Sequence, residues 1–402
     1  IIEKAHVKKP IKRLWISSQT DKAIKDGFKN LKDGRLYDNL YHAAECRAEA
    51  DWIVGLNVTR ALTCKHNAQL SAGRVQSPTL AMIVQREEEI KNFKPKEYRT
   101  INIKTDKCNF TWVNKDNNSR IFNKEFSDKV ASKLRNSEGK IVKVTESHKK
   151  TFSPKLYDLT ELQRDCNKIF GYSAKQTLNI MQRLYENHKL LTYPRTDSRY
   201  ISKDIVATIP ERLKAISVGE YRMIATDLLK TKITGNKSFV DDSKVSDHHA
   251  IIPTEERGIL ENLSLEERHV YDLVVKRFLS VLMPPFEYIQ TTLEGEVNGE
   301  RLIAKGKVIK SKGWKKVFDR EDYEEDTDIK EQELPKINKG DVFKVKEVIE
   351  KKGETKPPAR FNEGTLLSAM ENPQKYITVD KESAKTLGET GGLGTVATRA
   401  DI

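Results

Sequence analysis

The chain is organised around residues 190–200, which read Leu190-Leu191-Thr192-Tyr193-Pro194-Arg195-Thr196-Asp197-Ser198-Arg199-Tyr200. The two leucines predict a short buried strand. Pro194 fixes its own φ and favours an extended backbone at the residue before it. Side chains two residues apart in an extended segment point to the same side, so the stretch places the Tyr193 phenol beside the Arg195 guanidinium.

A phenol beside a guanidinium suits covalent chemistry on a phosphodiester. Tyrosine attacks as its phenolate, and the ordinary pKa of the phenol is about 10. A fixed cation lowers that pKa and clamps a phosphate with two hydrogen bonds. Taken alone, the same residues fit a strand end with a buried tyrosine and a solvated arginine better than they fit an active site.

Helix-capping signals surround this stretch between residues 151 and 285. Ser173 and Gln176 form a capping box for the helix that begins after Ser173 and leads into residues 190–200. The apolar stripe of this helix is Leu178, Met181, Leu184 and Tyr185. Two further capping boxes pair Asp158 with Glu161, before Leu159–Phe170, and Ser264 with Glu267, before a helix buried through Val270, Val274, Phe278 and Val281. Outside this region, helices are predicted at Arg35–Thr63 and after Gln76, the latter with Leu80, Ile83 and Val84 inward.

A two-residue period indicates strands on both sides of the helical region. The first set includes residues 99–103, 110–113 and 141–144, with one helix near residues 127–135. The second set follows Pro284-Pro285, and Asn298-Gly299 predicts a type I′ hairpin turn between Tyr288–Glu296 and Leu302–Ile309. Residues 341–349 add a further strand.

The charge of the chain is strongly positive. Its 402 residues hold 72 Lys and Arg against 59 Asp and Glu, for a net charge of +13. The stretch 319–333 is acidic, with a local charge of −7, so the remainder carries +20. Such a surplus of positive charge is typical of a protein that binds phosphate groups. A charged surface that serves only to keep the protein in solution is the alternative explanation.

Several function classes are disfavoured by the motifs. The four cysteines form no Cys-x-x-Cys pair, and the eight histidines form no His-Glu-x-x-His, so neither a zinc site nor a disulfide framework is predicted. No apolar run approaches the ~20 residues of a membrane span, and no signal peptide opens the chain. We expect a cytoplasmic protein with reduced thiols. Because Ile1 is no initiator methionine, we also expect a piece of a longer protein.

Three separated motifs resemble those of type IA DNA topoisomerases, and their residues are most similar to the motifs of the bacterial topoisomerase III branch. The first is Thr192–Tyr200, which resembles the family's active-site signature. The other two, in the family's order, are Ser71-Ala72-Gly73-Arg74-Val75-Gln76-Ser77-Pro78-Thr79-Leu80 and His248-His249-Ala250-Ile251-Ile252-Pro253-Thr254. The resemblance covers nearly the whole chain.

The resemblance implies an α+β multidomain fold, part of the family's toroid. Residues 1–95 and 351–402 would form an incomplete helical base with the DNA groove. Residues 96–150 and 286–350 would form a β-rich arch, and residues 151–285 a helix-rich, winged-helix-like domain that presents the tyrosine.

The resemblance also assigns site residues. Tyr193 would be the nucleophile, Arg195 would stabilise charge on the reacting phosphate, and His248 would contact that phosphate. From the residues alone, a histidine pair is more often structural, and Arg47 and Asp51 fit an exposed ion pair on a helix. The implied DNA-binding residues are Arg47, Asp51, Arg60, Ser71, Ala72, Gly73, Arg74, Val75 and Gln76. Gly391–Thr395 lacks the lysine of a nucleotide-binding loop and is expected to be a structural or DNA-side turn.

The implied reaction is ATP-independent cleavage, strand passage and religation of single-stranded DNA through a 5′-phosphotyrosyl intermediate. It would relax negative supercoils or decatenate DNA, with a monomeric enzyme and no membrane partner. The family's Mg²⁺ is held by an N-terminal TOPRIM domain, and no such acidic motif occurs here. We therefore expect these residues to bind single-stranded DNA without cleaving it, and to hold no metal.

Two other classes of protein fit these motifs less well. A tyrosine recombinase joins to the 3′ phosphate through an Arg-His-x-x-Arg set, which His248-His249-Ala250-Ile251 lacks. A non-catalytic single-stranded DNA-binding protein would stack bases on aromatic side chains, and aromatics make up only 7% of this chain. The polarity of a trapped tyrosine adduct separates the three classes.

Overall fold

The computed structural model describes residues 2, 5–16, 21–245, 247–318, 329–376, 382, 385–386, 388 and 391–402. Contacts divide the chain into two units. The first comprises Ile1–Glu88, Pro154–Leu282 and Arg360–Ile402, and the second comprises Glu89–Ser153 and Met283–Ala359. The segment that contains Tyr193 therefore shares a unit with both end segments of the chain.

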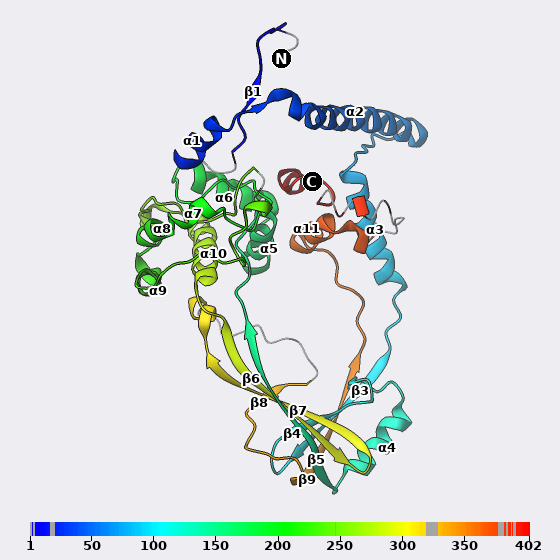
Figure 1. Cartoon of the computed structure of the whole chain (residues 1–402). Coiled ribbons are helices and arrows are strands. Elements are labelled where there is room, and N and C mark those ends of the chain that lie inside the picture. Colours follow the sequence, from blue (N-terminus) through cyan, green and yellow to red (C-terminus); the bar gives the residue numbers. More distant parts are fainter. Residues whose placement is uncertain are drawn as a thin grey trace. The chain divides into compact units, whose positions relative to one another are not determined.

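The first unit is mainly helical (Figure 1). Within it, α5 packs against α6 and α11, and α6 packs against α10. Its elements are β1 (Lys12–Arg13), α1 (Asp21–Lys29), β2 (Lys32–Asp33), η1 (Gly34–Tyr37), α2 (Asp38–His66), α3 (Gln76–Asn92, which ends in the second unit), α5 (Leu159–Phe170), α6 (Ala174–Glu186), α7 (Lys203–Val206), α8 (Ile209–Ala215), η2 (Gly219–Tyr221), α9 (Arg222–Leu229), η3 (Asp242–Lys244), η4 (Leu260–Asn262), α10 (Leu265–Leu282), α11 (Glu363–Glu371), η6 (Pro373–Lys375) and α13 (Val396–Asp401).

The helix starts near Tyr193 follow the capping signals. The Ser173 side chain accepts a hydrogen bond from the Gln176 amide at 3.0 Å and begins α6. The Gln176 side chain donates to Glu266 at 2.9 Å and does not return to the cap, so this predicted capping box is formed only in half. Ser264 and Glu267 form the complete box at the start of α10. Local polar residues thus fix where these helices begin.

The prediction for the buried face of α3 was wrong for two of its three residues, since only Ile83 is half-buried. Leu80 and Val84 are 61% and 48% exposed, whereas Thr79 and Met82 are 3% and 1% exposed. The inward face is set by residues from the opposite end of the chain, because Met82 packs in one cluster with Ala369, Met370 and Leu393. A single helix with apolar residues on two sides does not reveal which side meets such a partner.

The second unit is built on a mixed sheet whose strand order is β4-β3-β9-β5-β6-β7-β8. β4 also pairs with β7. The first six strands of this order, from β4 to β7, therefore form a closed ring of paired strands. Figure 1 shows β5, β6 and β7 as long strands running side by side. The elements are β3 (Glu97–Thr105), β4 (Asn109–Trp112), α4 (Lys124–Leu134), β5 (Glu138–Thr151), β6 (Phe286–Val297), β7 (Glu300–Ser311), η5 (Gly313–Val317), β8 (Glu331–Gln332) and β9 (Val342–Glu354).

The predicted hairpin is confirmed. Asn298 and Gly299 have φ of 48° and 78°, as a type I′ turn requires, and they join β6 to β7. Phe110 and Phe343 stack in the core with ring centroids 4.8 Å apart. Residues 319–328 of the acidic stretch lie outside the described residues.

Across the described residues, no helix has the length and apolar character needed to cross a membrane.

Candidate functional site

The Tyr193 segment is fixed by pairing with the segment that contains the two histidines. Leu191 forms a β-bridge with Pro253 and is fully buried. The Thr192 amide donates to the Ile252 carbonyl at 3.0 Å, and the Thr192 hydroxyl accepts from the Ile252 amide at 3.0 Å. The predicted strand is thus a single bridge, which nevertheless sets the register between the two segments.

Tyr193 is half-buried, and its ring lies against His248. The two ring centroids are 4.2 Å apart, and the planes meet at 34°. On another side, Tyr185 of α6 meets Tyr193 edge-on at 5.5 Å. The phenol is therefore held by two aromatic neighbours and remains partly open to solvent.

The second histidine of the pair has a different environment. One ring nitrogen of His249, Nδ1, lies 2.7 Å from the Ala250 carbonyl oxygen. Burial lowers the pKa of His249, which favours its neutral form. Of the two histidines, only His248 faces Tyr193.

Hydroxyl groups hold the residues after Tyr193 in place. Thr196 is buried, and its hydroxyl donates to the His248 carbonyl at 2.9 Å. The Thr196 carbonyl in turn accepts from the amide of Leu159, the first residue of α5, at 3.1 Å. Arg195 sits directly before Thr196 and is exposed, so a fixed backbone presents a cation to solvent.

A cavity of about 590 Å³ lies beside this segment, within the first unit. Tyr193 does not line it, but His248 and Arg195 do. The opposite lining comes from α11, the glycine-rich residues 391–394 and α13. Its lining residues are Asp158, Arg195, Thr196, Asp197, Asp247, His248, Glu371, Asn372, Gly388, Gly391, Gly394, Thr395, Val396 and Arg399.

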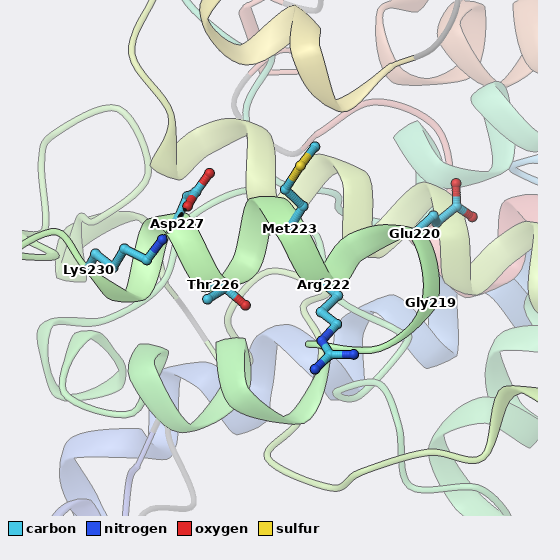
Figure 2. A pocket seen from close by; sticks show the side chains of 7 residues that line it. All are labelled: Gly219, Glu220, Arg222, Met223, Thr226, Asp227 and Lys230. Atoms are coloured by element: carbon cyan, nitrogen blue, oxygen red, sulfur yellow. Dashed lines mark hydrogen bonds and ion pairs between the residues drawn. The ribbon is translucent and has the colours of Figure 1, made fainter.

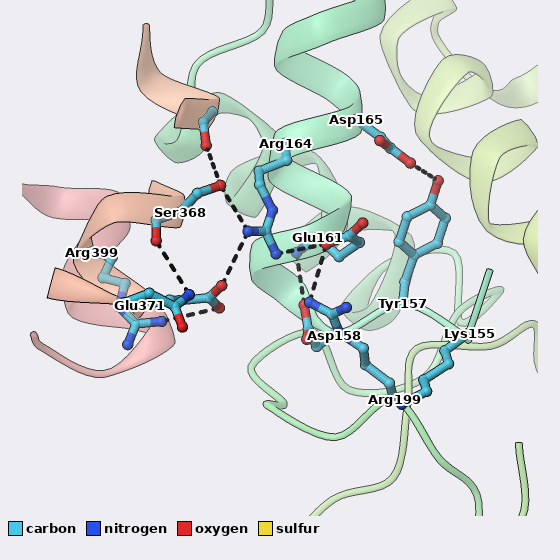
Figure 3. A network of polar contacts seen from close by, with 12 residues as sticks. Lys155, Tyr157, Asp158, Glu161, Arg164, Asp165, Arg199, Ser368, Glu371 and Arg399 are labelled. Carbon is cyan, nitrogen blue, oxygen red and sulfur yellow. Dashed lines mark hydrogen bonds and ion pairs between the residues drawn. The ribbon is translucent and has the colours of Figure 1, made fainter. Parts of the chain in front are cut away.

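Largely half-buried ion pairs support one wall of this cavity (Figure 3). Arg199 donates to Asp158 at 2.5 Å and to Glu161 at 3.1 Å. Burial raises the pKa of Asp158, and Arg199 opposes that rise by favouring the ionised carboxyl. Arg164 then joins Glu161, at 2.6 Å, to Glu371, at 3.1 Å.

Arg399 connects this network to the glycine-rich residues. It is 6% exposed and pairs with Glu371 at 3.4 Å. Its guanidinium also donates to the Leu393 carbonyl at 2.9 Å and to the Gly391 carbonyl. Gly392 has φ of 88° and would clash with the Met370 carbonyl if it had a side chain. The turn predicted at residues 391–395 is thus held by a buried cation, Arg399, which no sequence motif pointed to.

The predicted DNA-binding residues lie on α2 and on the segment after it, and hydrogen bonds join the two. The Arg74 side chain makes two hydrogen bonds to Asp51, one of them 2.7 Å long between Nη2 and Oδ2. The predicted pair of Arg47 with Asp51 is replaced by this one, although Arg47 and Arg74 together lower the pKa of Asp51, with the Arg74 hydrogen bond the largest cause. The Thr59 hydroxyl accepts from the Ala72 amide at 3.0 Å, which fixes the Ser71–Gln76 segment along the helix.

The same segment reaches the glycine-rich residues. Val75 packs on the cluster of Met82 and Leu393, and its side chain lies 3.2 Å from where a side chain on Gly394 would begin. Gly73, Ser71 and Gln76 belong to this segment, and Arg60 is exposed on α2. The predicted DNA-binding and catalytic residues are therefore linked through contacts inside one unit.

A second hollow, of about 450 Å³, lies over η2 and α9 (Figure 2). It is lined by Gly219, Glu220, Arg222, Met223, Thr226, Asp227 and Lys230, none of which the sequence singled out. Among the described residues, no group of three His, Cys, Asp or Glu side chains is placed to hold a metal ion.

Comparison with known proteins places these features in context. The sequence profile of the DNA topoisomerase family matches residues 35–402. DNA topoisomerase 3 of Bacillus cereus is 61% identical over 406 residues, and that of Bacillus subtilis is 55% identical over 405 residues. Each alignment covers 100% of this chain and 56% of the relative, so the chain spans about half the length of these curated relatives.

A solved structure is similar as well. Full-length topoisomerase I from Thermotoga maritima superposes with a TM-score of 0.69 at 26% sequence identity. The superposition covers 97% of this chain and 60% of that one.

Proposed function

This chain belongs to the type IA DNA topoisomerases, in their bacterial topoisomerase 3 branch, and we propose that it supplies the nucleophile and the DNA groove for cutting and resealing one DNA strand. The observation that carries the proposal is the Tyr193 ring held against His248, which lines a cavity together with Arg195. The substrate would be single-stranded DNA, including unpaired regions of negatively supercoiled DNA, and the outcome would be relaxation or decatenation by a monomeric enzyme.

The proposed step is a transesterification. The Tyr193 hydroxyl oxygen attacks the phosphorus of a phosphodiester, and the bond from phosphorus to the 3′ oxygen breaks. Tyr193 loses its proton, the 3′ oxygen gains one, and the 5′ phosphate is left joined to Tyr193. Resealing reverses the same bonds. Because one phosphodiester replaces another, no ATP is consumed.

Arg195 would clamp the reacting phosphate. Its guanidinium is exposed at the cavity and pairs with no carboxylate among the described residues, so both edges are open to phosphate oxygens. Charge builds on those oxygens in the transition state, which is where a fixed cation accelerates the reaction. His248 would orient the phenol through its ring contact and donate to the same phosphate.

The strand upstream of the cut would lie along α2. Arg47, Arg60 and Arg74 supply cations there, and the amides and side chains of Ser71–Gln76 supply further donors. Such contacts position a strand through its phosphates and carry no base preference.

The family's Mg²⁺ does not fit the described residues, because they contain no suitable cluster of three ligands. The chain covers 56% of its relatives, and we propose that the metal ligands and the general acid come from residues outside these 402.

The experiment compares these 402 residues with a version extended to the length of the relatives. We expect both to bind a single-stranded oligonucleotide, and only the longer protein to form a covalent adduct with Mg²⁺. Tyr193→Phe should abolish the adduct and leave binding intact. Tyr185→Phe is the matched control, because it removes a neighbouring hydroxyl and should keep the adduct.

The second candidate function is non-catalytic binding of single-stranded DNA. It is favoured by the exposed arginines Arg47, Arg60 and Arg74 on and beside α2, and it makes no use of the contact between Tyr193 and His248. It would replace the first proposal if the extended protein bound DNA but gave no adduct.

A further inference from the structure

A second tyrosine of the same stretch, Tyr200, lies among cations outside the cavity. The Lys155 ammonium is 5.0 Å from the centre of its ring, and the Lys244 ammonium is 4.6 Å from it. Lys244 Nζ also lies 3.5 Å from the Tyr200 hydroxyl oxygen. Two ammonium groups from separate parts of the first unit thus converge on one phenol.

Each of the three residues has a fixed backbone. The Ser198 hydroxyl donates to the Lys244 carbonyl at 2.7 Å and accepts from the Tyr200 amide at 3.2 Å. The Tyr200 carbonyl accepts from the Ala250 amide at 2.9 Å. The Lys155 carbonyl accepts from the buried Arg277 at 3.0 Å. The backbone beneath the three side chains is therefore held by hydrogen bonds, while both lysine side chains are exposed.

The positive charge of this cluster is only partly balanced. Asp241 pairs with Lys244 at 3.1 Å. Among the described residues, no carboxylate pairs with Lys155. A hydrogen bond from Lys155, with a second from Lys244, lowers the pKa of Tyr200, as expected where a phenol faces two cations. Bringing two ammonium groups together is unfavourable unless an anion joins them.

Within the cluster of Lys155, Tyr200 and Lys244, Tyr200 lies on one of the two paired segments that carry the proposed cleavage site. Thr196 bonds the His248 carbonyl and Tyr200 bonds the Ala250 amide, so one pair of segments carries both sites. None of the three residues lines the cavity beside Arg195. A strand held at Arg195 would meet this cluster only after leaving the cavity.

We propose that Lys155, Tyr200 and Lys244 bind a backbone phosphate of the DNA strand next to, and outside, the cleavage cavity. This inference rests on the proposed function. The two ammonium groups would each meet one phosphate oxygen, and the phenol would donate a hydrogen bond to the same group. Contacts of this kind depend on salt and not on base sequence.

The test measures binding of fluorescent oligo-dT by the 402-residue chain as salt is varied, with a short and a long oligonucleotide. The charge-removing variant is Lys155→Gln with Lys244→Gln. Its matched control is Lys203→Gln with Lys214→Gln, which removes two exposed lysines that are paired with carboxylates in the same unit. We expect the test variant to bind the long oligonucleotide about tenfold more weakly at low salt, with a log–log salt slope smaller by about 0.7, the value for one phosphate contact of a single strand. The short oligonucleotide and the control variant should behave as the unmodified chain.

Two further variants separate charge from folding. Lys155→Arg with Lys244→Arg keeps both charges and should retain binding. Tyr200→Phe keeps the ring and should show a smaller loss than the double glutamine variant. If the unmodified chain binds and the double glutamine variant matches it in affinity and slope, this inference is overturned while the proposed function stands. An equal loss in the arginine variant would also overturn it. Failure of the unmodified chain to bind any single strand would instead overturn the proposed function.

Discussion

The Tyr193 and His248 rings lie 4.2 Å apart, centroid to centroid, although they come from segments that are distant in the chain. Hydrogen bonds from Thr192 and Thr196 to the histidine segment hold the two backbones together. The contact is therefore a property of the fold, and the proposed chemistry makes use of it.

Replacing His248 should impair cleavage and spare DNA binding. In the extended protein, His248→Gln removes the ring that orients the phenol and donates to the phosphate, and we expect adduct formation to slow about 10²-fold or more, in the range typical of losing one donor to the charge that develops in the transition state. The Thr196 bond survives, because it is made to the His248 carbonyl. His249→Gln is the control and should change the rate little. Single-turnover cleavage measures both, and equal effects of the two variants would contradict the role of His248.

The pair of Asp51 with Arg74 gives a test in which charge and geometry predict opposite results. Asp51→Ala removes a negative charge from the groove, which on charge alone should strengthen DNA binding. Because Asp51 holds Arg74 with two hydrogen bonds, we expect Asp51→Ala to weaken binding by about threefold to tenfold, as does loss of an orienting charge-assisted pair.

Anisotropy titrations of Asp51→Ala, Arg74→Ala and the double variant measure the coupling between the two side chains. The Asp51 and Arg74 side chains are 54% and 39% exposed, so loss of their ion pair should change the free energy of unfolding by less than about 1 kcal/mol. Tighter binding by Asp51→Ala would show that Arg74 needs no orientation.

Arg399 should be essential for stability. Arg399→Ala leaves Glu371 and two carbonyls without their donor, and breaking a buried pair on one side costs about 3–5 kcal/mol. Urea unfolding measures this loss. Arg222→Ala, at an exposed position on α9, is the control and should cost less than about 0.5 kcal/mol. Similar unfolding midpoints for the two variants would contradict a structural role of Arg399.

His249 predicts a pH dependence of stability. Burial lowers its pKa in the folded protein below the value of about 6.5 in the unfolded chain. The unfolded chain therefore binds this proton more readily, and the stability from His249 is present above about pH 6.5 and is lost as the pH falls through the folded pKa. The difference in unfolding free energy between the unmodified chain and His249→Gln should shrink below pH 6.5. A difference that does not change with pH would contradict this assignment.

Local features of the sequence predicted local structure well. Ser173, Asp158 and Ser264 cap the helices that they were expected to cap, and Asn298-Gly299 forms its hairpin turn, because each feature depends on neighbours within a few residues. The buried face of α3 and the pairing of Asp51 could not be predicted in this way. Met82 meets Met370, and Asp51 meets Arg74, across long stretches of chain that carry no local signal.

The contacts that form the cavity wall could not be predicted from local sequence either. Arg399 lies in a short helix with no unusual pattern, and only the fold shows that it reaches the carbonyls of Gly391 and Leu393. Asp158 was recognised as a helix cap, but its pairing with Arg199 depends on the path taken by residues 190–200. By contrast, the motif around Tyr193 was recognisable because its residue types are contiguous.

The central claim is that Tyr193 is the nucleophile and joins to a 5′ phosphate. The direct measurement is mass spectrometry of the peptide trapped by the extended protein on a single-stranded oligonucleotide with Mg²⁺. We predict a nucleotide linked through its 5′ phosphate to Tyr193. A link through a 3′ phosphate, or to any residue other than Tyr193, would contradict the claim.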